Sequence, residues 1–176
     1  MVSVIAGDDG FNTSAGGILL QTRYKVFKDP KNFTTTKMTP TVINELTVSI
    51  TPKSANSVFK LELCMPYEAQ GSFSENMMVS ATRNGSFIAP PNVGSRVGGI
   101  APRTISVDSD NGKTLDLLSF SFIDEPATTS PIVYTAAVID GAGSHNIKIN
   151  ATISDLDNDQ YERGMSTFIV TELSGT

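Results

Sequence analysis

Two blocks of the chain alternate between apolar and polar residues on either side of a proline-containing turn. The first covers residues 46–63 and the second residues 118–134. A period of two places every second side chain on one face of a strand, so each block predicts two strands that share an apolar face. The apolar positions are Leu46, Val48, Ile50, Phe59, Leu61 and Leu63 in the first block, and Leu118, Phe120, Phe122, Ile132 and Tyr134 in the second. Units of this kind are typical of a β-sandwich.

Short apolar runs between turn residues continue along the rest of the chain. They predict strands at about 19–27, 42–51, 57–65, 75–83, 103–108, 114–123, 131–139, 146–153 and 166–173. Pro52, Asn84-Gly85 and Asn111-Gly112 supply turn conformations between them. A polar loop is expected from the first strand to Pro40, and the Gly- and Pro-rich residues 84–102 form the longest irregular stretch. No helix of useful length is expected.

The length and the strand count predict an all-β fold in one domain. A chain of 176 residues can bury a single core. Residues 18–176 are expected to form an antiparallel two-sheet sandwich, either jelly-roll or immunoglobulin-like. The jelly roll is favoured because the Cys…Trp…Cys pattern of immunoglobulin domains is missing. Residues 1–17 are small, polar and Gly-rich, and are expected to be an extended arm that becomes ordered against a partner.

Composition excludes several classes of function. A net charge of −5 argues against non-specific binding of nucleic acid, and no apolar run approaches the ~20 residues that span a membrane. The N-terminus lacks the basic start and long apolar stretch of a secretory signal, which indicates folding in a reducing cytoplasm. Cys64 is the only cysteine, so no intramolecular disulfide can form. We expect it to be a buried or half-buried thiol.

Candidate catalytic and metal-binding residues are weak. His145 is the only histidine, lies in a Gly-rich turn and is expected to be solvated. A triad could combine Ser144, His145 and a distant Asp, but no Gly-x-Ser-x-Gly elbow supports it. Residues 155–159 begin like an EF-hand loop, yet Gln160 and Ser166 stand where Gly and Glu are needed. A looser calcium site there, or at the acidic turn 108–112, stays open. We therefore predict a non-enzymatic protein with no catalytic, cofactor-binding or metal-binding residues and no cofactor, because Glu45, Glu62 and Glu172 also stand singly on their strands.

The positive charge of the chain is concentrated near its N-terminus. Five cations against Asp29 alone give residues 23–37 a net charge of about +4, so the remainder carries about −9. Such a segment is either a solvated strand and loop or a docking surface for an acidic protein scaffold. The candidate docking residues are Arg23, Lys25, Lys28, Lys31 and Lys37.

Apolar residues on both faces of some strands suggest contacts between subunits. Met77, Val79, Ile147 and Ile149 lie in predicted strands whose opposite faces also hold Met78 and Ile153. Surplus apolar strand surface of this kind predicts self-association, most simply as a homotrimer.

Several segments resemble a family of structural proteins from tailed bacteriophages, of the cyanophage and marine phage type. The resemblance lies in the Val-Ser-Ile-Thr-Pro-Lys-Ser core of residues 46–63, in residues 119–134, in Ser-Thr-Phe-Ile-Val-Thr-Glu-Leu at 166–173 and in Ile-Leu-Leu-Gln-Thr-Arg-Tyr at 18–24. Together these segments cover most of residues 18–173, in the order that the family has.

The resemblance implies a virion-surface β-sandwich, often trimeric, found in capsid-attached proteins and in tail-fibre tips. It implies no catalytic residues. The leading hypothesis is a trimeric capsid decoration or cement protein, made in the cytoplasm of an infected bacterium, with itself and the major capsid protein as partners. The alternative is a tail-fibre or spike tip whose 84–102 and 140–146 loops bind a host glycan. A stand-alone chain without the long N-terminal shaft of fibre proteins favours the first.

Overall fold

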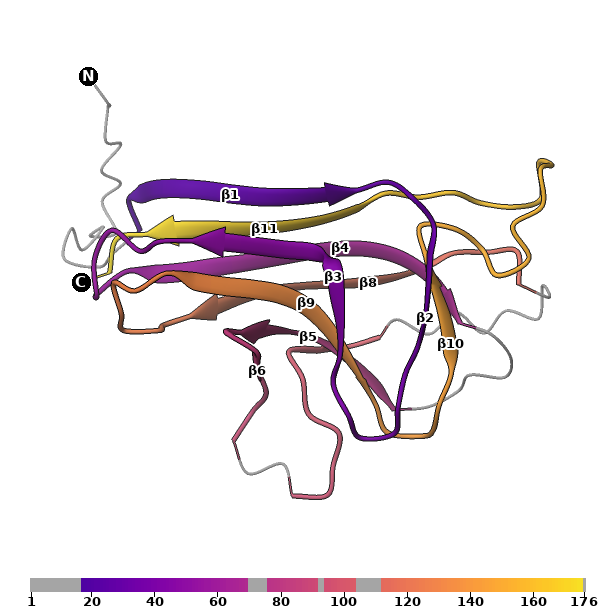
Figure 1. The fold of residues 1–176 in the computed structure, drawn as a ribbon, viewed down its shortest axis with the longest axis horizontal. Helices are drawn as coiled ribbons and strands as arrows, with labels where there is room; N and C mark the ends of the chain where they lie inside the picture. The colour runs from indigo at the N-terminus through magenta and orange to yellow at the C-terminus, as the bar shows by residue number, and fades with distance from the viewer. Residues whose placement is uncertain (1–16, 70–75, 92–93, 104–111, 176) are drawn as a thin grey trace, which may run out of the picture.

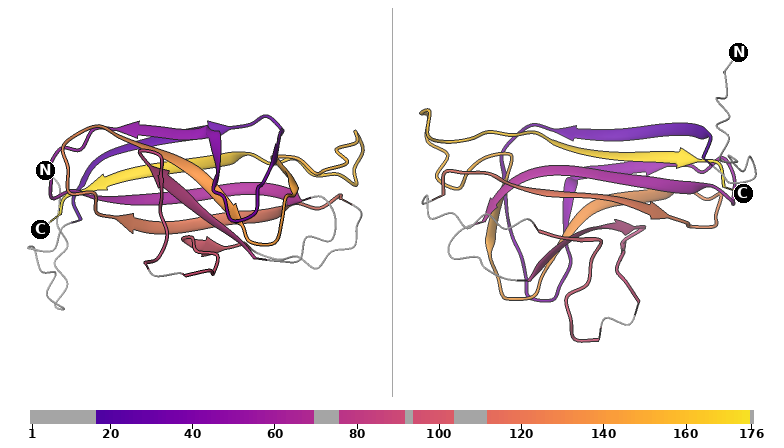
Figure 2. Two further views of the ribbon diagram at one scale, coloured as in Figure 1. Left: turned by 60° about the horizontal axis from the view of Figure 1, so that its bottom comes forward. Right: turned by 180° about the vertical axis from the view of Figure 1, so that it is seen from behind.

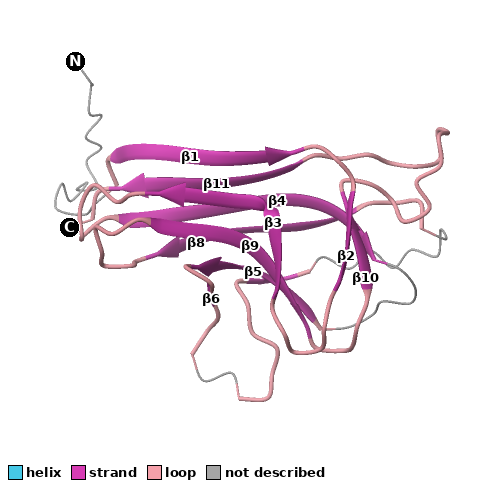
Figure 3. Ribbon diagram, in the orientation of Figure 1, coloured by secondary structure: helices cyan, strands magenta, loops and turns pink. Residues whose placement is uncertain are grey.

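The computed structural model describes residues 17–69, 76–91, 94–103 and 112–175, and it shows a β-sandwich. Figure 3 contains only strands and loops in this part of the chain. Accordingly, no helix among the described residues is long and apolar enough to cross a membrane. The strands are β1 (Leu19–Phe27), β2 (Lys31–Thr34), β3 (Thr41–Ile50), β4 (Val58–Ala69), β5 (Met77–Arg83), β6 (Ser86–Phe87), β7 (Ala101–Pro102), β8 (Asp116–Asp124), β9 (Ile132–Asp140), β10 (Asn146–Ile149) and β11 (Ser166–Leu173).

The strands form two antiparallel sheets (Figure 1). In the first, β1 pairs with β11, β11 with β4, and β4 with β8; beyond the end of β11, β4 also pairs with β10, which pairs with β2. In the second, β3 pairs with β9 and β9 with β5, whose other edge holds the short β6 and β7. The main strands thus alternate between the sheets as in two interlocked Greek keys, which is the jelly roll that the sequence favours over the immunoglobulin topology.

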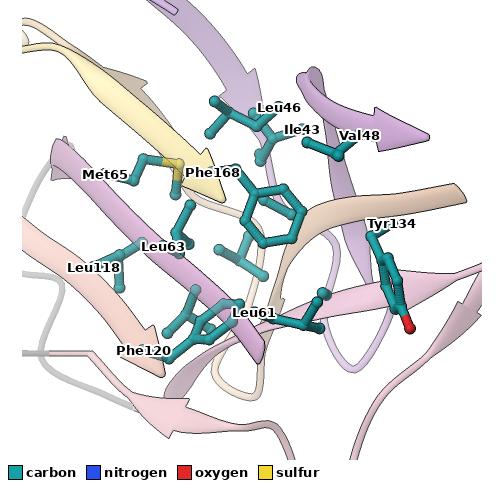
Figure 4. Close-up of a cluster of buried hydrophobic side chains, with 14 of the residues drawn as sticks. Ile43, Leu46, Val48, Leu61, Leu63, Met65, Leu118, Phe120, Tyr134 and Phe168 are labelled. Carbon is teal, nitrogen blue, oxygen red and sulfur yellow. The ribbon is translucent and has the colours of Figure 1, made fainter. Parts of the chain in front are cut away.

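The core lies between the two sheets and is built from the alternation read in the sequence. On β4, Phe59, Leu61 and Leu63 are buried, and the intervening side chains point outward. They face Leu46, Val48 and Ile50 of β3 and Tyr134 of β9, and Figure 4 shows most of this cluster around Phe168 of β11. The apolar positions of both sequence blocks are buried except Phe122, which is half-buried at the rim of the core.

Several element boundaries differ from the expectation. The expected polar loop before Pro40 contains β2, whose four residues pair with β10. Strand β10 ends at Ile149 rather than near 153, because Asn150 takes a positive φ of 63° and turns the chain. Most of the strand expected at 103–108 lies outside the described residues. The Asn84-Gly85 turn is confirmed: both residues have positive φ and join β5 directly to β6.

Candidate docking surface

Strand β1 forms one edge of the first sheet and carries two of the predicted docking residues. Among the described residues, β11 is its only hydrogen-bonded neighbour. Arg23 and Lys25 are paired with Val170 and Phe168 of β11, which are both buried. Because paired residues of an antiparallel sheet point to the same side, the side chains of Arg23 and Lys25 project from the inner face, toward the second sheet. They stay exposed because they stand at the rim of the sandwich. Inward-pointing charges on an edge strand also discourage edge-to-edge aggregation.

The other three docking residues follow along the chain. Lys28 is exposed in the turn between β1 and β2. Lys31 stands on β2 rather than in a loop, and its Nζ lies 3.0 Å from Glu45 Oε1 of the opposite sheet. Lys37 is exposed beyond β2, where its backbone forms a bridge with Asp140. The structure therefore places Arg23, Lys25 and Lys28 on β1 and the turn after it, while Lys31 already has an intramolecular partner.

Strand β1 and Ile18 just before it expose apolar side chains that the sequence did not predict to be exposed. Ile18 is 74% exposed, Leu19 61% and Tyr24 70%, with Leu20 and Val26 also well exposed. The surplus of apolar strand surface expected at residues 77–79 and 147–153 is not found there. Met77, Val79, Ile147 and Ile149 are buried in the core, and Met78 and Ile153 are half-buried. The available signal was the presence of apolar residues on both faces of residues 19–27.

His145 is not a simply solvated turn residue. Its Nδ1 lies 2.7 Å from Oδ2 of Asp140, a fully buried carboxylate at the end of β9. Asp140 also accepts hydrogen bonds from the Thr35 hydroxyl at 2.8 Å and from the Ala142 amide at 2.8 Å. Burial raises the pKa of Asp140, but the hydrogen bonds from His145, Ala142, Thr35 and the Gly143 amide outweigh burial and hold the pKa below its usual value.

This network joins β2 to the β9–β10 turn and does not assemble a nucleophile. The Thr35 hydroxyl also accepts a hydrogen bond from the His145 amide at 3.0 Å, so it is engaged on both sides. Ser144 is exposed next to the histidine in sequence. These hydrogen bonds therefore hold the residue after β2 against the β9–β10 turn. They were not predictable from the turn sequence, because Thr35 is 110 positions away.

The acidic turn at 155–159 is held by ion pairs. Asp155 lies 2.8 Å from Lys148 Nζ and 2.5 Å from Arg163 Nε. Burial raises the pKa of Asp155, but the hydrogen bonds and charges of Lys148 and Arg163 outweigh burial and hold this pKa below its usual value. Within the described part of the chain, no group of three or more His, Cys, Asp or Glu side chains could hold a metal ion. Asp108 and Asp110 of the other acidic turn lie outside the described residues.

One of the remaining candidate residues takes a position that changes its interpretation. Cys64 is exposed on the outer face of the first sheet, so the expectation of a buried or half-buried thiol is wrong.

The three strand glutamates lie apart from one another. Glu172 is fully buried and accepts hydrogen bonds from the Gln21 side chain and the Lys53 amide. Glu45 and Glu62 have separate partners, Lys31 and Lys60, so these three carboxylates are not brought together as a glycosidase pair.

Comparisons with solved structures give distant similarities of fold. No protein-family model matches the chain, and no curated protein does. Among solved structures, the chain is similar to the VP2 protein in the infectious bursal disease virus subviral particle, with 11% sequence identity and a TM-score of 0.39. The match covers 89% of this chain and 42% of the VP2 chain, so the chain spans less than half the length of that protein.

Proposed function

We propose that this chain is a structural protein of a virion, and more specifically a homotrimeric decoration or cement protein on the exterior of a tailed-bacteriophage capsid. The observation that carries the proposal is strand β1, an edge strand with apolar side chains and two cations open to solvent. An edge of this kind offers apolar burial and positive charge to a negatively charged partner surface. The resemblance of residues 18–173 to phage structural proteins supplies the biological context.

In this proposal, β1 and the following turn dock on the major capsid protein. Arg23, Lys25 and Lys28 provide the electrostatic attraction, and residues 1–17 act as an arm that becomes ordered on assembly. The protein is made in the cytoplasm of the infected bacterium and functions at the virion surface. Because each contact is weak, repetition by the symmetry of the shell provides much of the affinity.

The proposal is tested by charge reversal and by copy number. Lys25→Glu with Lys28→Glu should reduce occupancy on particles and make attachment less sensitive to salt, because exposed charge pairs are screened within about 10 Å at 0.1 M. Lys31 is left in place since it pairs with Glu45. The control is Lys53→Glu, an exposed side chain at the β3–β4 turn. We expect hundreds of copies per particle and a solution mass that is a multiple of three times 18.7 kDa. Attachment indifferent to both salt and charge reversal would contradict the electrostatic part.

A receptor-binding tip is the second candidate, and one feature favours it. A hollow of about 440 Å³ lies in the β10–β11 loop, lined by Asp155, Asp157, Asn158 and Tyr161 among others. Carboxylate and amide groups can hydrogen-bond sugar hydroxyls, and an aromatic ring offers a stacking surface. Binding to a glycan array, lost in Tyr161→Ala, together with only a few trimers per virion, would favour this function over the first.

A further inference from the structure

The outer face of the first sheet is a broad surface that no described element covers. Figure 2, right, shows β1, β11, β4 and β8 lying side by side in front of the rest of the molecule. The outward side chains align in rows across the four strands. One row is Thr22, Thr171, Lys60 and Ile123, and the next is Tyr24, Ile169, Glu62 and Ser121. A third row is Val26, Thr167, Cys64 and Ser119.

These three rows carry little charge. Lys60 and Glu62 are their only ionised side chains, and they neutralise each other through an ion pair of 2.8 Å on the same strand. The rest of the twelve positions hold Thr, Ser, Cys, Ile, Val and Tyr. A solvated sheet face normally carries polar and charged residues, whereas interface centres are depleted in charge. In a chain with a net charge of −5, this face is neutral and does not repel a second copy.

We infer that this face binds the same face of a second copy of the chain, through a two-fold axis that lies parallel to the sheet and crosses the strands at the level of Leu61. Such an axis places β4 of one copy over β4 of the other in the opposite direction. The row that contains Lys60 then faces the row that contains Glu62 in the other copy. Two sheets packed in this way lie about 10 Å apart with strands aligned to within about 30°.

The side chains are complementary under that operation. Lys60 faces Glu62 of the second copy, and Glu62 faces Lys60, so both charges gain a partner of opposite sign. On each neighbouring strand a large side chain meets a small one: Tyr24 faces Thr22, Ile169 faces Thr171, and Ile123 faces Ser121. A two-fold contact uses the same surface on both copies, so whenever one residue meets a second residue across the axis, the second also meets the first. The surface must therefore be complementary to itself.

The available area suits a moderate interface. Four strands about 4.8 Å apart and about eight residues long cover roughly 500 Å² of flat sheet. Side-chain relief raises the accessible area toward the ~800 Å² per partner of a standard interface. The contact uses the outer face of β1 and not its Arg23 and Lys25 side. It is therefore independent of the proposed docking on a capsid.

Charge-swap variants test the inference. Lys60→Glu places a new carboxylate opposite Glu62 of the second copy at two symmetric positions, and Glu62→Lys places a new ammonium group opposite Lys60 in the same way. Each variant alone should have half the solution mass of the wild type and associate at least about tenfold more weakly, because like charges then face each other across the interface. Mixed in equal amounts, the two variants should pair with each other, since every contact between positions 60 and 62 is again between opposite charges.

The measurement is analytical ultracentrifugation of each variant, of their mixture and of the wild type. Asp159→Lys, an exposed position in the β10–β11 loop, changes the net charge as Glu62→Lys does and should keep the wild-type mass. If a charge variant fails to fold by circular dichroism, Ser121→Arg, at an exposed position facing Ile123 of the second copy, should also halve the mass.

The inference is overturned if the wild type and the charge variants have equal masses, or if the mixture does not associate. Equal masses at three copies would leave the proposed trimer intact and remove the two-fold. Variants of wild-type mass that no longer attach to particles would show that this face binds the shell instead.

Discussion

Strands β1 and β9 are both nine residues long, yet they lie at opposite extremes of burial. On β1 only Gln21 and Phe27 are even partly covered, whereas on β9 every residue except Val133 is buried. Strand β9 pairs with β3 on one edge and β5 on the other, while β1 pairs with β11 alone among the described strands. Both sequences are rich in apolar residues, so composition does not explain the contrast.

The positions of β1 and β9 in the sandwich explain their difference in burial. A strand with neighbours on both edges and a sheet over its inner face loses most of its solvent contact, so β9 can use small residues such as Ala136 and Ala137. An edge strand with the same hydrophobicity keeps apolar groups in water, which is unfavourable by about 25 cal/mol per Å² of apolar surface relative to burial. The proposed docking would bury the apolar groups of β1 against another molecule, whereas those of β9 contribute to folding of the single chain.

The sharpest test of this contrast compares one tyrosine on each strand. Tyr134 is fully buried, its ring centroid lies 6.0 Å from that of Phe59, and its hydroxyl donates a hydrogen bond to Asp124 at 2.6 Å, while Tyr24 is 70% exposed. Tyr134→Ala should lower the free energy of unfolding by about 3–5 kcal/mol, because it leaves a cavity and removes one hydrogen-bond donor from Asp124, which keeps its ion pair with Arg83. Tyr24→Ala should change it by less than about 0.5 kcal/mol in dilute protein.

Urea unfolding followed by circular dichroism measures both values. A large loss for Tyr24→Ala at the lowest protein concentrations would mean that β1 is buried within its own chain, and the contrast between the strands would fail.

The next effect concerns the end of β9, where Asp140 is buried with four hydrogen-bond donors around it. Asp140→Asn replaces an acceptor-only carboxylate by an amide, and should cost about 1–3 kcal/mol because donors from His145, Thr35 and the β9–β10 turn lose their charged partner. The exposed Asp159→Asn is the matched control.

The same substitution has a pH signature. The pKa of Asp140 is lower in the folded protein than its ordinary value of 3.8, so the unfolded state binds the proton more readily. The stabilisation is therefore complete above about pH 4 and is lost as pH falls through the folded pKa. Wild-type stability should decline over this acid range more steeply than that of Asp140→Asn. If the free energy of unfolding declines equally in both proteins over this acid range, the ionised carboxylate of Asp140 does not stabilise the fold.

The alternation of side chains predicted most of the fold because it is a local property. Phe59, Leu61 and Leu63 had to share a face wherever the strand was placed, and Asn84-Gly85 dictated its own turn. The jelly-roll order followed from strand number and the missing immunoglobulin pattern. Strand β2 escaped prediction because Lys31 and Asn32 look like loop residues, and only pairing with β10 makes the segment extended.

The candidate surface was less predictable, since it depends on which strands are neighbours. Residues 19–27 did not reveal that they form an edge, and residues 77 and 147 did not reveal that Met77 and Ile147 would both be buried within their own chain. The Cys64 prediction was wrong because the preference of cysteine for burial outweighed the pattern of the strand: Cys64 alternates with Lys60 and Glu62, and all three side chains lie on the outward face. His145 could not be placed at all without knowing that Thr35 and Asp140 meet it.

The smallest effect concerns Gln21, one of the two partly buried positions of β1. Gln21 is half-buried, and its side-chain amide donates to the Thr51 carbonyl at 2.8 Å and to the buried carboxylate of Glu172, which fastens β1 to β11 and to the β3–β4 turn. Gln21→Ala should lower the free energy of unfolding by about 1 kcal/mol, since Glu172 keeps its hydrogen bond from the Lys53 amide. Arg23→Ala, two residues further on the same face but exposed, should change the free energy of unfolding by less than about 0.5 kcal/mol.

Hydrogen exchange of the β1 amides should accelerate in Gln21→Ala while that of β9 stays unchanged, because an edge strand can open locally without the core. Equal losses for both variants would mean that the Gln21 side chain holds β1 no more strongly than the exposed Arg23 does.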